Sequence, residues 1–190
     1  MSYSNYLTNS VYSLGDFQVT PMRESDIFLI KEWRNAQMDV LRQNKPISDE
    51  EQANYYRNIV VPGFRKEQPN IMLFSFLHLG ECIGYGGLTN IHWLDMRVEL
   101  SFLVNPVHAA DQLIYERDFK HFIELMKEIT FKELGFNRIF TETYDIREHH
   151  IGILESCGFV AEGRMRSHVC INGIFVDSLI HGILKKDYGF

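Results

Sequence analysis

Apolar and polar positions alternate most clearly in the last third of the chain. The alternation over 138–144 predicts a strand, and residues 146–157 then carry apolar positions at helical spacing. Gly158 stands where the end of that helix favours a positive φ. Two apolar runs follow, joined by Asn172-Gly173, which is the strongest short signal for a type I′ turn because that turn needs positive φ at both positions. The pattern therefore predicts a strand, a helix and a closing hairpin.

The first two thirds of the chain predict a mixture of strands and helices. Apolar positions at Ile27, Ile30 and Trp33 fall on one face of a helix, after a short alternating strand. A later and longer helix ends at Gly135, because glycine tolerates the backbone conformation that follows a helix. The predicted strands are 17–20, 71–77, 82–88 and 97–104, and the longer helix covers about 119–134.

Two helix starts carry the spacing of a capping box. In this motif a short polar side chain and an acidic one three residues later each bond the other's backbone amide. Ser48 and Glu51 open the second predicted helix, which follows the one at Ile27. Asp145 and Glu148 repeat the spacing, with Asp in place of Ser or Thr, before the helix of the last third.

The order of these elements predicts a single-domain α/β (α+β) fold. A central mixed, twisted sheet with helices on both faces would bury the apolar surface that the pattern provides. The chain has no internal repeat, low-complexity tract or linker. Residues 1–14 are expected to form an N-terminal arm, and residues 15–190 to form the domain.

Composition narrows the class of protein. The chain has 190 residues, 45% of them apolar and 23% charged, which is typical of a domain with one buried core. The formal net charge of −6 argues against nucleic acid or an anionic membrane as a partner, because neutralising phosphates requires clustered Lys and Arg. No apolar run reaches the ~20 residues that span a bilayer, and the polar N-terminus does not resemble a signal peptide. A cytoplasmic protein is expected.

The cysteines and histidines predict neither a disulfide framework nor a metal site. Cys82, Cys157 and Cys170 are odd in number and widely spaced, as is typical of reduced thiols. His149 and His150 are adjacent on a predicted helix, where successive side chains diverge by roughly 100°, so they cannot chelate one ion together. The chain has neither His-x3-His nor Cys-x2-Cys spacing.

Five segments across residues 16–188 carry a family resemblance. They read FQVTPMRESD, ECIGYGGLTNI, VELSFLVNP, FKELGFNRIFTETYD and ILESCGFVAEGRMRSHVCINGIFVDSLIHGILKKDY. In this order they resemble the GNAT superfamily of acyl-CoA N-acyltransferases, in particular the branch of ribosomal-protein N-terminal acetyltransferases. A narrower segment, EWRNAQMDVLRQNKPISDEEQANYYRNI, is similar to the first two helices of GNAT enzymes that acetylate nucleotide-linked amino sugars.

The resemblance implies a V-shaped gap between the strands at 98–104 and 138–144, in which acetyl-CoA lies. The acceptor amine attacks the thioester directly, so the protein has to position the substrates, accept a proton and stabilise an oxyanion. Glu99 matches the position of the family's general base. The alternative is a Glu99 that points outward or caps a loop amide.

The resemblance also assigns the binding of the cosubstrate, acetyl-CoA. Phe102, Leu103 and Val104 match the strand whose backbone pairs with the pantetheine arm, although their side chains also suit an ordinary core. The family then has an Arg/Gln-x-x-Gly-x-Gly/Ala loop whose amides cradle the pyrophosphate. Residues 105–113 contain neither glycine nor arginine. Retained, weakened and lost CoA binding are all compatible with this loop.

Three residues of the 105–113 loop affect whether it can bind the phosphates of CoA. Ala109 and Ala110 are small and allow a close backbone approach to a phosphate. Asp111 would repel a phosphate if it faced the site. Arg147, where the family often has Asn, is a candidate phosphate ligand; Arg117 and Lys120 are alternatives that also suit a solvated helix face.

The proton donor for the departing CoA thiolate is not evident. Many GNAT enzymes place a tyrosine where Leu154 stands, although the ribosomal branch often lacks it. The family often has a small residue where His150 stands. Tyr144 is a candidate substitute for the missing tyrosine.

The acceptor site is expected at the first two helices. Arg34 and Arg42 are eight residues apart, so they share a helix face and could hold a diphosphate, with Asn35 beside them. The predicted function is acetyl transfer from acetyl-CoA to a primary amine of a small molecule, with a nucleotide-linked amino sugar favoured. The alternatives are protein N-terminal acetylation and a non-catalytic binding protein of the same fold. Exposed strand edges at the closing hairpin favour a homodimer.

Overall fold

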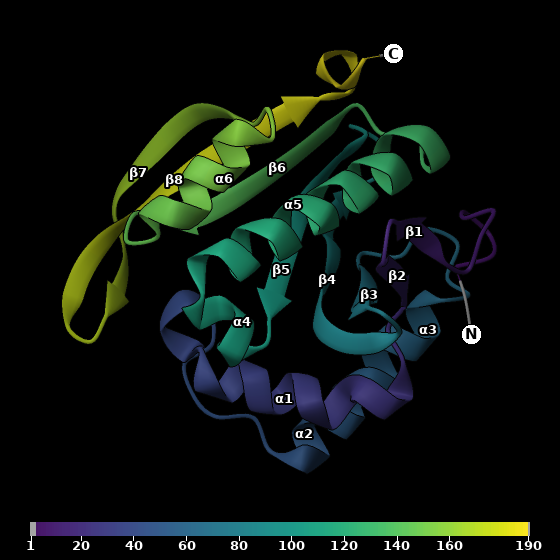
Figure 1. Ribbon diagram of the computed structural model, residues 1–190, viewed down its shortest axis with the longest axis horizontal. Helices are drawn as coiled ribbons and strands as arrows, with labels where there is room; N and C mark the ends of the chain where they lie inside the picture. The colour runs from purple at the N-terminus through teal and green to yellow at the C-terminus, as the bar shows by residue number, and fades with distance from the viewer. Residues whose placement is uncertain (1–2, 190) are drawn as a thin grey trace.

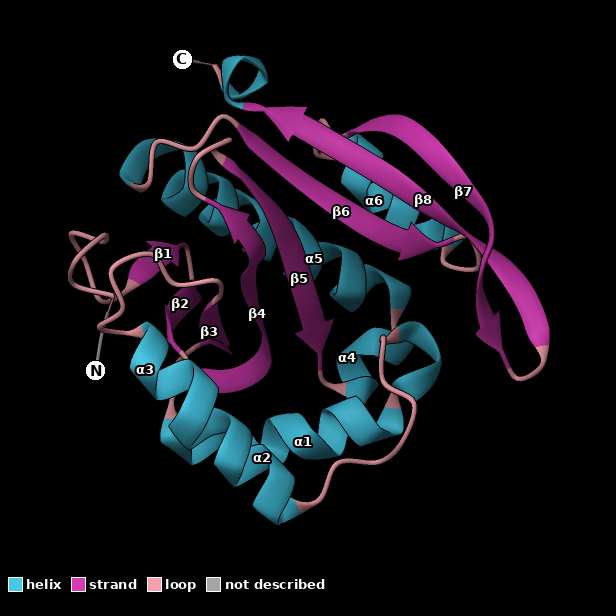
Figure 2. Cartoon of the chain, turned by 180° about the vertical axis from the view of Figure 1, so that it is seen from behind, coloured by secondary structure: helices cyan, strands magenta, loops and turns pink. Residues whose placement is uncertain are grey.

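Eight strands form one mixed sheet in the computed structural model, which describes residues 3–189 (Figures 1 and 2). Their order in space is β1-β2-β3-β4-β5-β6-β8-β7, and β5 and β6 pair in parallel while the other neighbours pair antiparallel. The strands are β1 (Tyr12–Leu14), β2 (Phe17–Pro21), β3 (Met72–His78), β4 (Glu81–His92), β5 (Arg97–Val104), β6 (Arg138–Tyr144), β7 (Val160–Ile171) and β8 (Ile174–Leu184).

The helices cover both faces of the sheet, as the sequence predicts. α5 and α6 lie over one face, and α1 and α2 lie on the other side, across the ends of the central strands (Figures 1 and 2). The α-helices are α1 (Ile27–Ala36), α2 (Asp49–Tyr55), α3 (Val61–Gly63), α4 (Pro106–Ala110), α5 (Gln112–Lys127) and α6 (Glu148–Ser156). Short 3₁₀ turns occur at Glu24–Asp26, Met38–Val40 and Lys185–Tyr188, and π-helical turns at Tyr56–Val60 and Glu128–Glu133.

The predicted cap of α2 is confirmed and that of α6 is wrong. Ser48 and Glu51 form a complete capping box at the start of α2. At α6 the N-cap residue is Arg147, and no side chain caps the helix. Asp145 instead forms an ion pair with Arg164 of β7, because strand pairing brings that guanidinium alongside it.

The closing hairpin follows the turn signal. Asn172 has φ 51° and Gly173 has φ 82°, as a type I′ turn requires. β7 forms an edge of the sheet, and nearly all its side chains are exposed. The homodimer expected from this edge stays a prediction.

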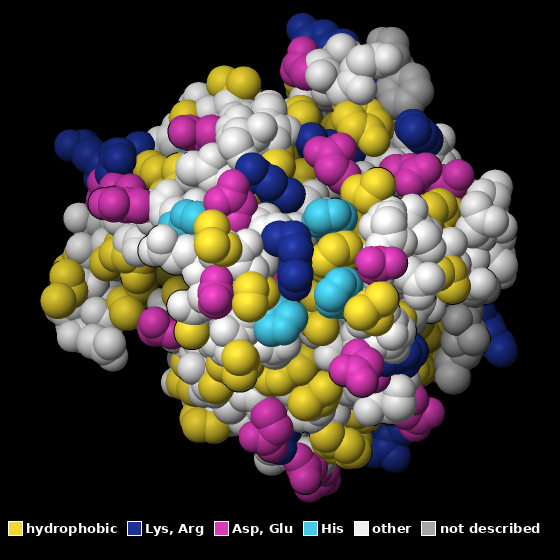
Figure 3. Space-filling view, in the orientation of Figure 1, with side chains coloured by type: hydrophobic (Ala, Val, Ile, Leu, Met, Phe, Trp, Pro, Cys, Tyr) yellow, Lys and Arg dark blue, Asp and Glu magenta, His cyan; other side chains and the backbone are white. Residues whose placement is uncertain are grey.

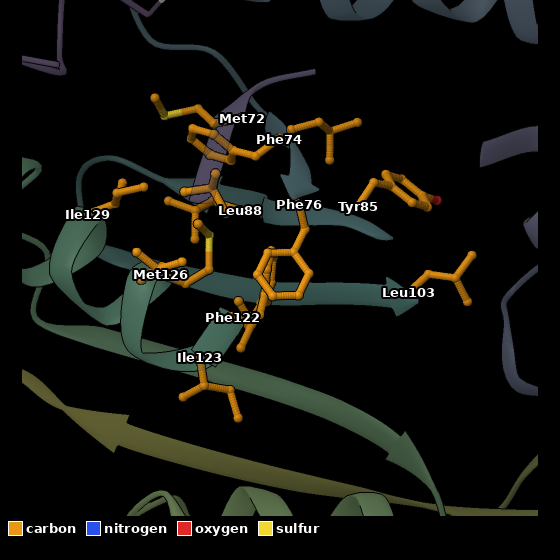
Figure 4. Packing of buried hydrophobic residues seen from close by; sticks show 14 of the residues in the cluster. Met72, Phe74, Phe76, Tyr85, Leu88, Leu103, Phe122, Ile123, Met126 and Ile129 are labelled. Atoms are coloured by element: carbon orange, nitrogen blue, oxygen red, sulfur yellow. The ribbon is translucent and has the colours of Figure 1, made fainter. Parts of the chain in front are cut away.

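A large part of the core lies between the sheet and α5. Phe122, Ile123 and Met126 are fully buried and point from α5 towards the strands (Figure 4). Gly86 of β4 makes this packing possible, because a Cβ there would lie 2.2 Å from the Ser101 carbonyl oxygen and 2.8 Å from the Phe122 ring. The helix and the sheet therefore approach closely beside the start of the gap between β5 and β6.

The segment that the sequence sets apart as an N-terminal arm packs on the domain from residue 3 onward. Tyr3 is 1% exposed, and its ring contacts Phe64 and Phe74. Its hydroxyl donates to the Leu73 carbonyl oxygen at 3.2 Å and accepts from the Leu73 N–H at 2.7 Å. β1 then adds an edge strand to β2.

Tyr3→Phe is expected to lower the free energy of unfolding by about 1–3 kcal/mol, because the buried Leu73 N–H loses its acceptor. The Leu73 carbonyl oxygen keeps a donor, the Met22 N–H at 3.0 Å. Urea unfolding measures the difference. Tyr6→Phe is the matched control, since the Tyr6 hydroxyl bonds the Glu67 carbonyl oxygen at the surface and its loss should cost no more than about 0.5 kcal/mol. Equal losses in the two variants would contradict the prediction.

Candidate active site

β5 and β6 run side by side for only three residue pairs and then separate. The pairing joins Arg97–Glu99 to Arg138–Phe140. Beyond it a cavity of about 300 Å³, here called the central cleft, opens between residues 100–103 of β5 and 141–144 of β6. The V-shaped gap that the resemblance implies is therefore present.

Two further cavities adjoin the central cleft. The first, of about 380 Å³, lies beneath α1 and α2 and shares Arg34, Thr89 and Ser101 with the cleft; it is called the α2 cavity. The second, of about 560 Å³, lies between α4, the start of α5 and the start of α6; it shares Arg147 and His150 with the cleft and is called the α6 cavity. The two further cavities thus share lining residues with the central cleft, one on each side.

Glu99 lines the central cleft, although it is only 7% exposed. One carboxylate oxygen accepts from Arg42 Nη2 at 2.7 Å, and the other accepts from the Asn90 amide. Asn90 reaches Glu99 because β4 is irregular between Thr89 and His92 and Asn90 itself has φ 46°. The carboxylate therefore sits at the narrow end of the cleft, where β5 and β6 part.

Arg42 spans the cleft between its two strands. Its Nη2 lies 2.7 Å from Glu99 Oε1 on β5 and 2.9 Å from Glu142 Oε2 on β6. Burial lowers the pKa of Arg42, but the bond to Glu99 and the two carboxylate charges outweigh burial and raise that pKa above its usual value. Glu142 also lies 3.2 Å from His168 Nδ1. A positively charged nitrogen is thus held between two carboxylates inside the cleft.

The other predicted acceptor residues are held within the protein. Arg34 lines both the central cleft and the α2 cavity, and it donates to the Tyr85 hydroxyl and to Gln43 Oε1. Asn35 bonds both the N–H and the carbonyl oxygen of Ile47 and lines none of the three cavities. It fixes the loop that carries Arg42. Arg34 and Arg42 therefore both line the central cleft, each bonded to side chains of the protein, and Asn35 does not line it.

The segment that replaces the expected phosphate loop is the short helix α4. Asn105 caps it by accepting from the His108 N–H, and the Ala109 N–H bonds the Asn105 carbonyl oxygen. Ala109 and Ala110 line the α6 cavity. Asp111 then caps α5, because its Oδ1 accepts from the N–H groups of the second and third residues of α5 at 3.0 Å each. A carboxylate therefore occupies the helix start at which the resemblance implies phosphate binding.

Backbone positions along β5 differ in what they offer a ligand. Phe102 and Leu103 line the central cleft, and Phe102 also stacks on Phe119 with ring centroids 4.7 Å apart. Val104 does not line the cleft, and its carbonyl oxygen accepts from Gln37 Nε2 at 2.9 Å. Of the three predicted pantetheine contacts, the first two face the cleft.

Arg117 and Lys120 belong to a solvated helix face. Figure 3 shows Lys, Arg and His side chains near the middle of the face that α5 covers, with acidic side chains among them. Arg117 pairs with Asp118, and Lys120 pairs with Glu116. Neither cation lines any of the three cavities described above. Asp118 also holds His108 of α4, and this contact fixes α4 against α5.

A buried polar cluster lies where the central cleft meets the α6 cavity. The Tyr115 hydroxyl is 2.7 Å from His150 Nδ1 and 2.8 Å from Arg147 Nη2. His150 stacks on Phe119 with ring centroids 4.3 Å apart, and burial lowers its pKa well below the usual value. Tyr115 was not predicted from the sequence as a site residue. Leu154, one turn along α6 from His150, is fully buried.

The described residues contain neither a cluster of metal ligands nor a membrane-spanning helix. Within residues 3–189 no group of three His, Cys, Asp or Glu side chains is placed to hold a metal ion. The helices of that part of the chain are all too short or too polar to cross a membrane.

Burial raises the pKa of the Cys82 thiol to about 12, so this thiol is protonated at neutral pH.

Comparisons with known proteins agree with this geometry. A family model described as an acetyltransferase (GNAT) domain matches residues 20–180. The protein named "Putative ribosomal N-acetyltransferase YdaF" of Bacillus subtilis (strain 168) is 22% identical over 138 residues, which are 72% of this chain and 73% of that protein.

Solved structures of the same fold include two of spermidine N-acetyltransferase from Vibrio cholerae. The complex with CoA and spermine has a TM-score of 0.77 at 18% identity and covers 92% of this chain and 99% of its own. A dodecameric structure in an intermediate state has a TM-score of 0.75 at 18% identity and covers 93% and 98%. At this identity the likeness shows a shared fold.

Proposed function

The chain belongs to the GNAT acetyltransferase family and is an acetyl-CoA-dependent N-acetyltransferase. We propose that its acceptor is a small-molecule primary amine and that the ammonium group of this amine binds between Glu99 and Glu142. The observation that carries this proposal is the position of Arg42 Nη2, 2.7 Å and 2.9 Å from those two carboxylates. An ammonium group offers the same charge and the same N–H donors. Spermine in the Vibrio cholerae complex is also a cationic amine, which supports this class of acceptor.

In the proposed reaction Glu99 is the general base. Once the amine has displaced Arg42, the Glu99 carboxylate takes its proton, and the neutral nitrogen attacks the acetyl carbonyl in the central cleft. The backbone of Phe102 and Leu103 lies along the cleft, where it can hold the pantetheine arm and an amide can stabilise the oxyanion. No enzyme nucleophile takes part.

The cavities suggest how the two substrates are arranged. CoA phosphates fit the α6 cavity, since Arg147 lines it and Ala109 and Ala110 leave room for close approach. The body of the acceptor fits the α2 cavity, which has an apolar part. Gln52 lines that cavity at 3% exposure, and its side-chain amide has no hydrogen-bond partner in the described chain. The acceptor should therefore carry an apolar segment and a group that bonds an amide. The apolar lining comprises Met22, Ile30, Ile47 and Leu73.

A nucleotide-linked amino sugar and a protein N-terminus remain competing acceptors. The first would need Arg34 and Arg42 to leave their present partners and bind phosphates. The second is suggested by the similarity to YdaF. A panel containing a polyamine, an apolar primary amine, an amino-sugar nucleotide and an N-terminal peptide, assayed by release of the CoA thiol, separates the classes.

Arg42→Gln gives the decisive comparison within that panel. The KM for a cationic amine is expected to fall about five- to tenfold, because the amine no longer competes with the guanidinium for the carboxylates. Arg57→Gln is the matched control, since the Arg57 side chain is exposed and, within residues 3–189, bonds only its helix neighbours Ala53 and Asn54. A rise in KM for an amino-sugar nucleotide in Arg42→Gln would instead show that Arg42 binds its phosphates and would overturn the cationic-amine proposal.

A further inference from the structure

Acyl transfer from a thioester leaves a thiolate that has to be protonated. Leu154 has no proton to give, and it is fully buried. His150 lies four residues earlier on α6, so the two side chains share one helix face. His150 lines both the central cleft and the α6 cavity. A titratable group therefore stands on the face where the departing sulfur needs a donor.

The hydrogen bonds of the Tyr115 hydroxyl allow an assignment of the protons in this cluster. Arg147 can only donate, so the Tyr115 oxygen accepts from it at 2.8 Å. The Tyr115 O–H is then free to donate to His150 Nδ1 at 2.7 Å. A neutral imidazole that accepts at Nδ1 carries its hydrogen on Nε2. Nε2 has no hydrogen-bond partner within residues 3–189, so its N–H is available to a ligand.

We propose that His150 and Tyr115 form a proton relay to the departing CoA sulfur. As the bond between the carbonyl carbon and sulfur breaks, its electron pair goes to sulfur. His150 gives the Nε2 proton to that sulfur and takes the phenolic proton of Tyr115 at Nδ1. Arg147 stabilises the resulting phenolate, and water in the α6 cavity returns a proton to Tyr115. The relay rests on acetyl transfer from CoA, whichever amine accepts the group.

The charged surroundings of His150 agree with a neutral resting ring. Arg147 and His149 lie near it on α6, and His181 lies near it on β8. Burial is the largest cause that lowers its pKa, and these three groups lower it further. Burial raises the pKa of Tyr115, while the positive charge of Arg147 opposes that rise. Arg147 is thus placed to ease the transient loss of the phenolic proton.

Tyr115→Phe is the first test, because it removes one oxygen and keeps the ring. With the amine identified by the panel, kcat is expected to fall about ten- to a hundredfold while the KM for acetyl-CoA changes less than twofold. The alkaline limb of the kcat–pH profile, where the wild type loses activity as Tyr115 ionises, should disappear. His150→Gln should lower kcat similarly. His121→Gln is the control, since His121 stacks on Phe17 and lines none of the three cavities.

Three outcomes would overturn the relay. One is a Tyr115→Phe enzyme with more than half the wild-type kcat and an unchanged pH profile. Another is a parallel change of kcat, KM and melting temperature, which would indicate packing alone. The third is a loss of the alkaline limb in Tyr144→Phe and not in Tyr115→Phe, since Tyr144 also lines the cleft.

Arg147→Gln keeps the relay testable if Tyr115→Phe does not fold. Loss of the guanidinium makes the phenol harder to ionise, so the alkaline limb should move up by about one pH unit. An unmoved limb would contradict the relay. If the wild type acetylates no amine of the panel, the same variants are compared by their slow hydrolysis of acetyl-CoA, which expels the same thiolate. That result separates a failed relay from a wrongly chosen acceptor.

Discussion

Glu99→Gln is expected to lower kcat about a hundred- to a thousandfold at saturating substrates. The amide keeps the shape of the side chain and its oxygen can still accept from Arg42 or Asn90, but it cannot take a proton from the amine. Steady-state kinetics across pH measure the effect. The acid limb of the wild-type profile should be lost in the variant, because a general base has been removed.

Glu142→Gln serves as the comparison for Glu99→Gln. Glu142 contacts the same nitrogen of Arg42 from the opposite strand, so it tests the cation site without the base. Its KM for a cationic amine should rise about tenfold, with kcat within about threefold of the wild type. A Glu99→Gln enzyme that keeps more than a tenth of the wild-type kcat would remove Glu99 from the role of base. Equal effects of the two variants on kcat would do the same.

Asp111→Asn is expected to tighten the binding of CoA about tenfold. The Asp111 Oδ1 accepts from the N–H groups of Leu113 and Ile114 at the start of α5, and an asparagine oxygen can keep both bonds. If CoA phosphates bind in the α6 cavity as proposed, the substitution removes a negative charge that repels them, which is worth about 1–2 kcal/mol at the edge of a protein. Isothermal titration of wild type and variant with CoA gives the two dissociation constants.

The same titration with pantetheine is the control for Asp111→Asn. Pantetheine lacks the pyrophosphate and the nucleotide, so its affinity should be equal in the two proteins. Equal CoA affinities would show that the phosphates bind away from the start of α5. A gain for both ligands would indicate a change in the shape of the cleft and not the loss of repulsion.

Local signals account for most of the fold. The strand predictions at 97–104 and 138–144 coincide with β5 and β6, and the turn at Asn172-Gly173 forms as expected. These elements depend on alternation, helix stops and turn chemistry, all of which act within a few residues. The predicted cap at Asp145 fails for a long-range reason. Its carboxylate lies 19 residues before Arg164 in sequence but beside it in the sheet.

The site was only partly predictable because its contacts join distant parts of the chain. Arg42 and Glu142 are 100 residues apart in sequence, and no local pattern marks their pairing. Tyr115 has helical core spacing, so nothing in the sequence separates it from the apolar positions that follow. Asn90 offered a weak signal, since asparagine tolerates a positive φ better than most residues and the irregularity of β4 uses this. The roles assigned to these side chains stay predictions until the variants are measured.

The short pairing between β5 and β6 divides the sheet into two parts that are joined by few backbone hydrogen bonds. Three residue pairs hold β1–β5 to β6–β8–β7, whereas seven residue pairs join β6 to β8. Beyond these pairs, the ion pairs of Arg42 with Glu99 and Glu142 connect β5 and β6 across the central cleft. A cosubstrate that lies along the unpaired edge of β5 would take the place of a missing strand and connect the two parts of the sheet. In the free protein, amide hydrogens on the edges of β5 and β6 that face the central cleft should therefore exchange faster than their burial suggests. Their exchange should slow when the cosubstrate occupies the cleft.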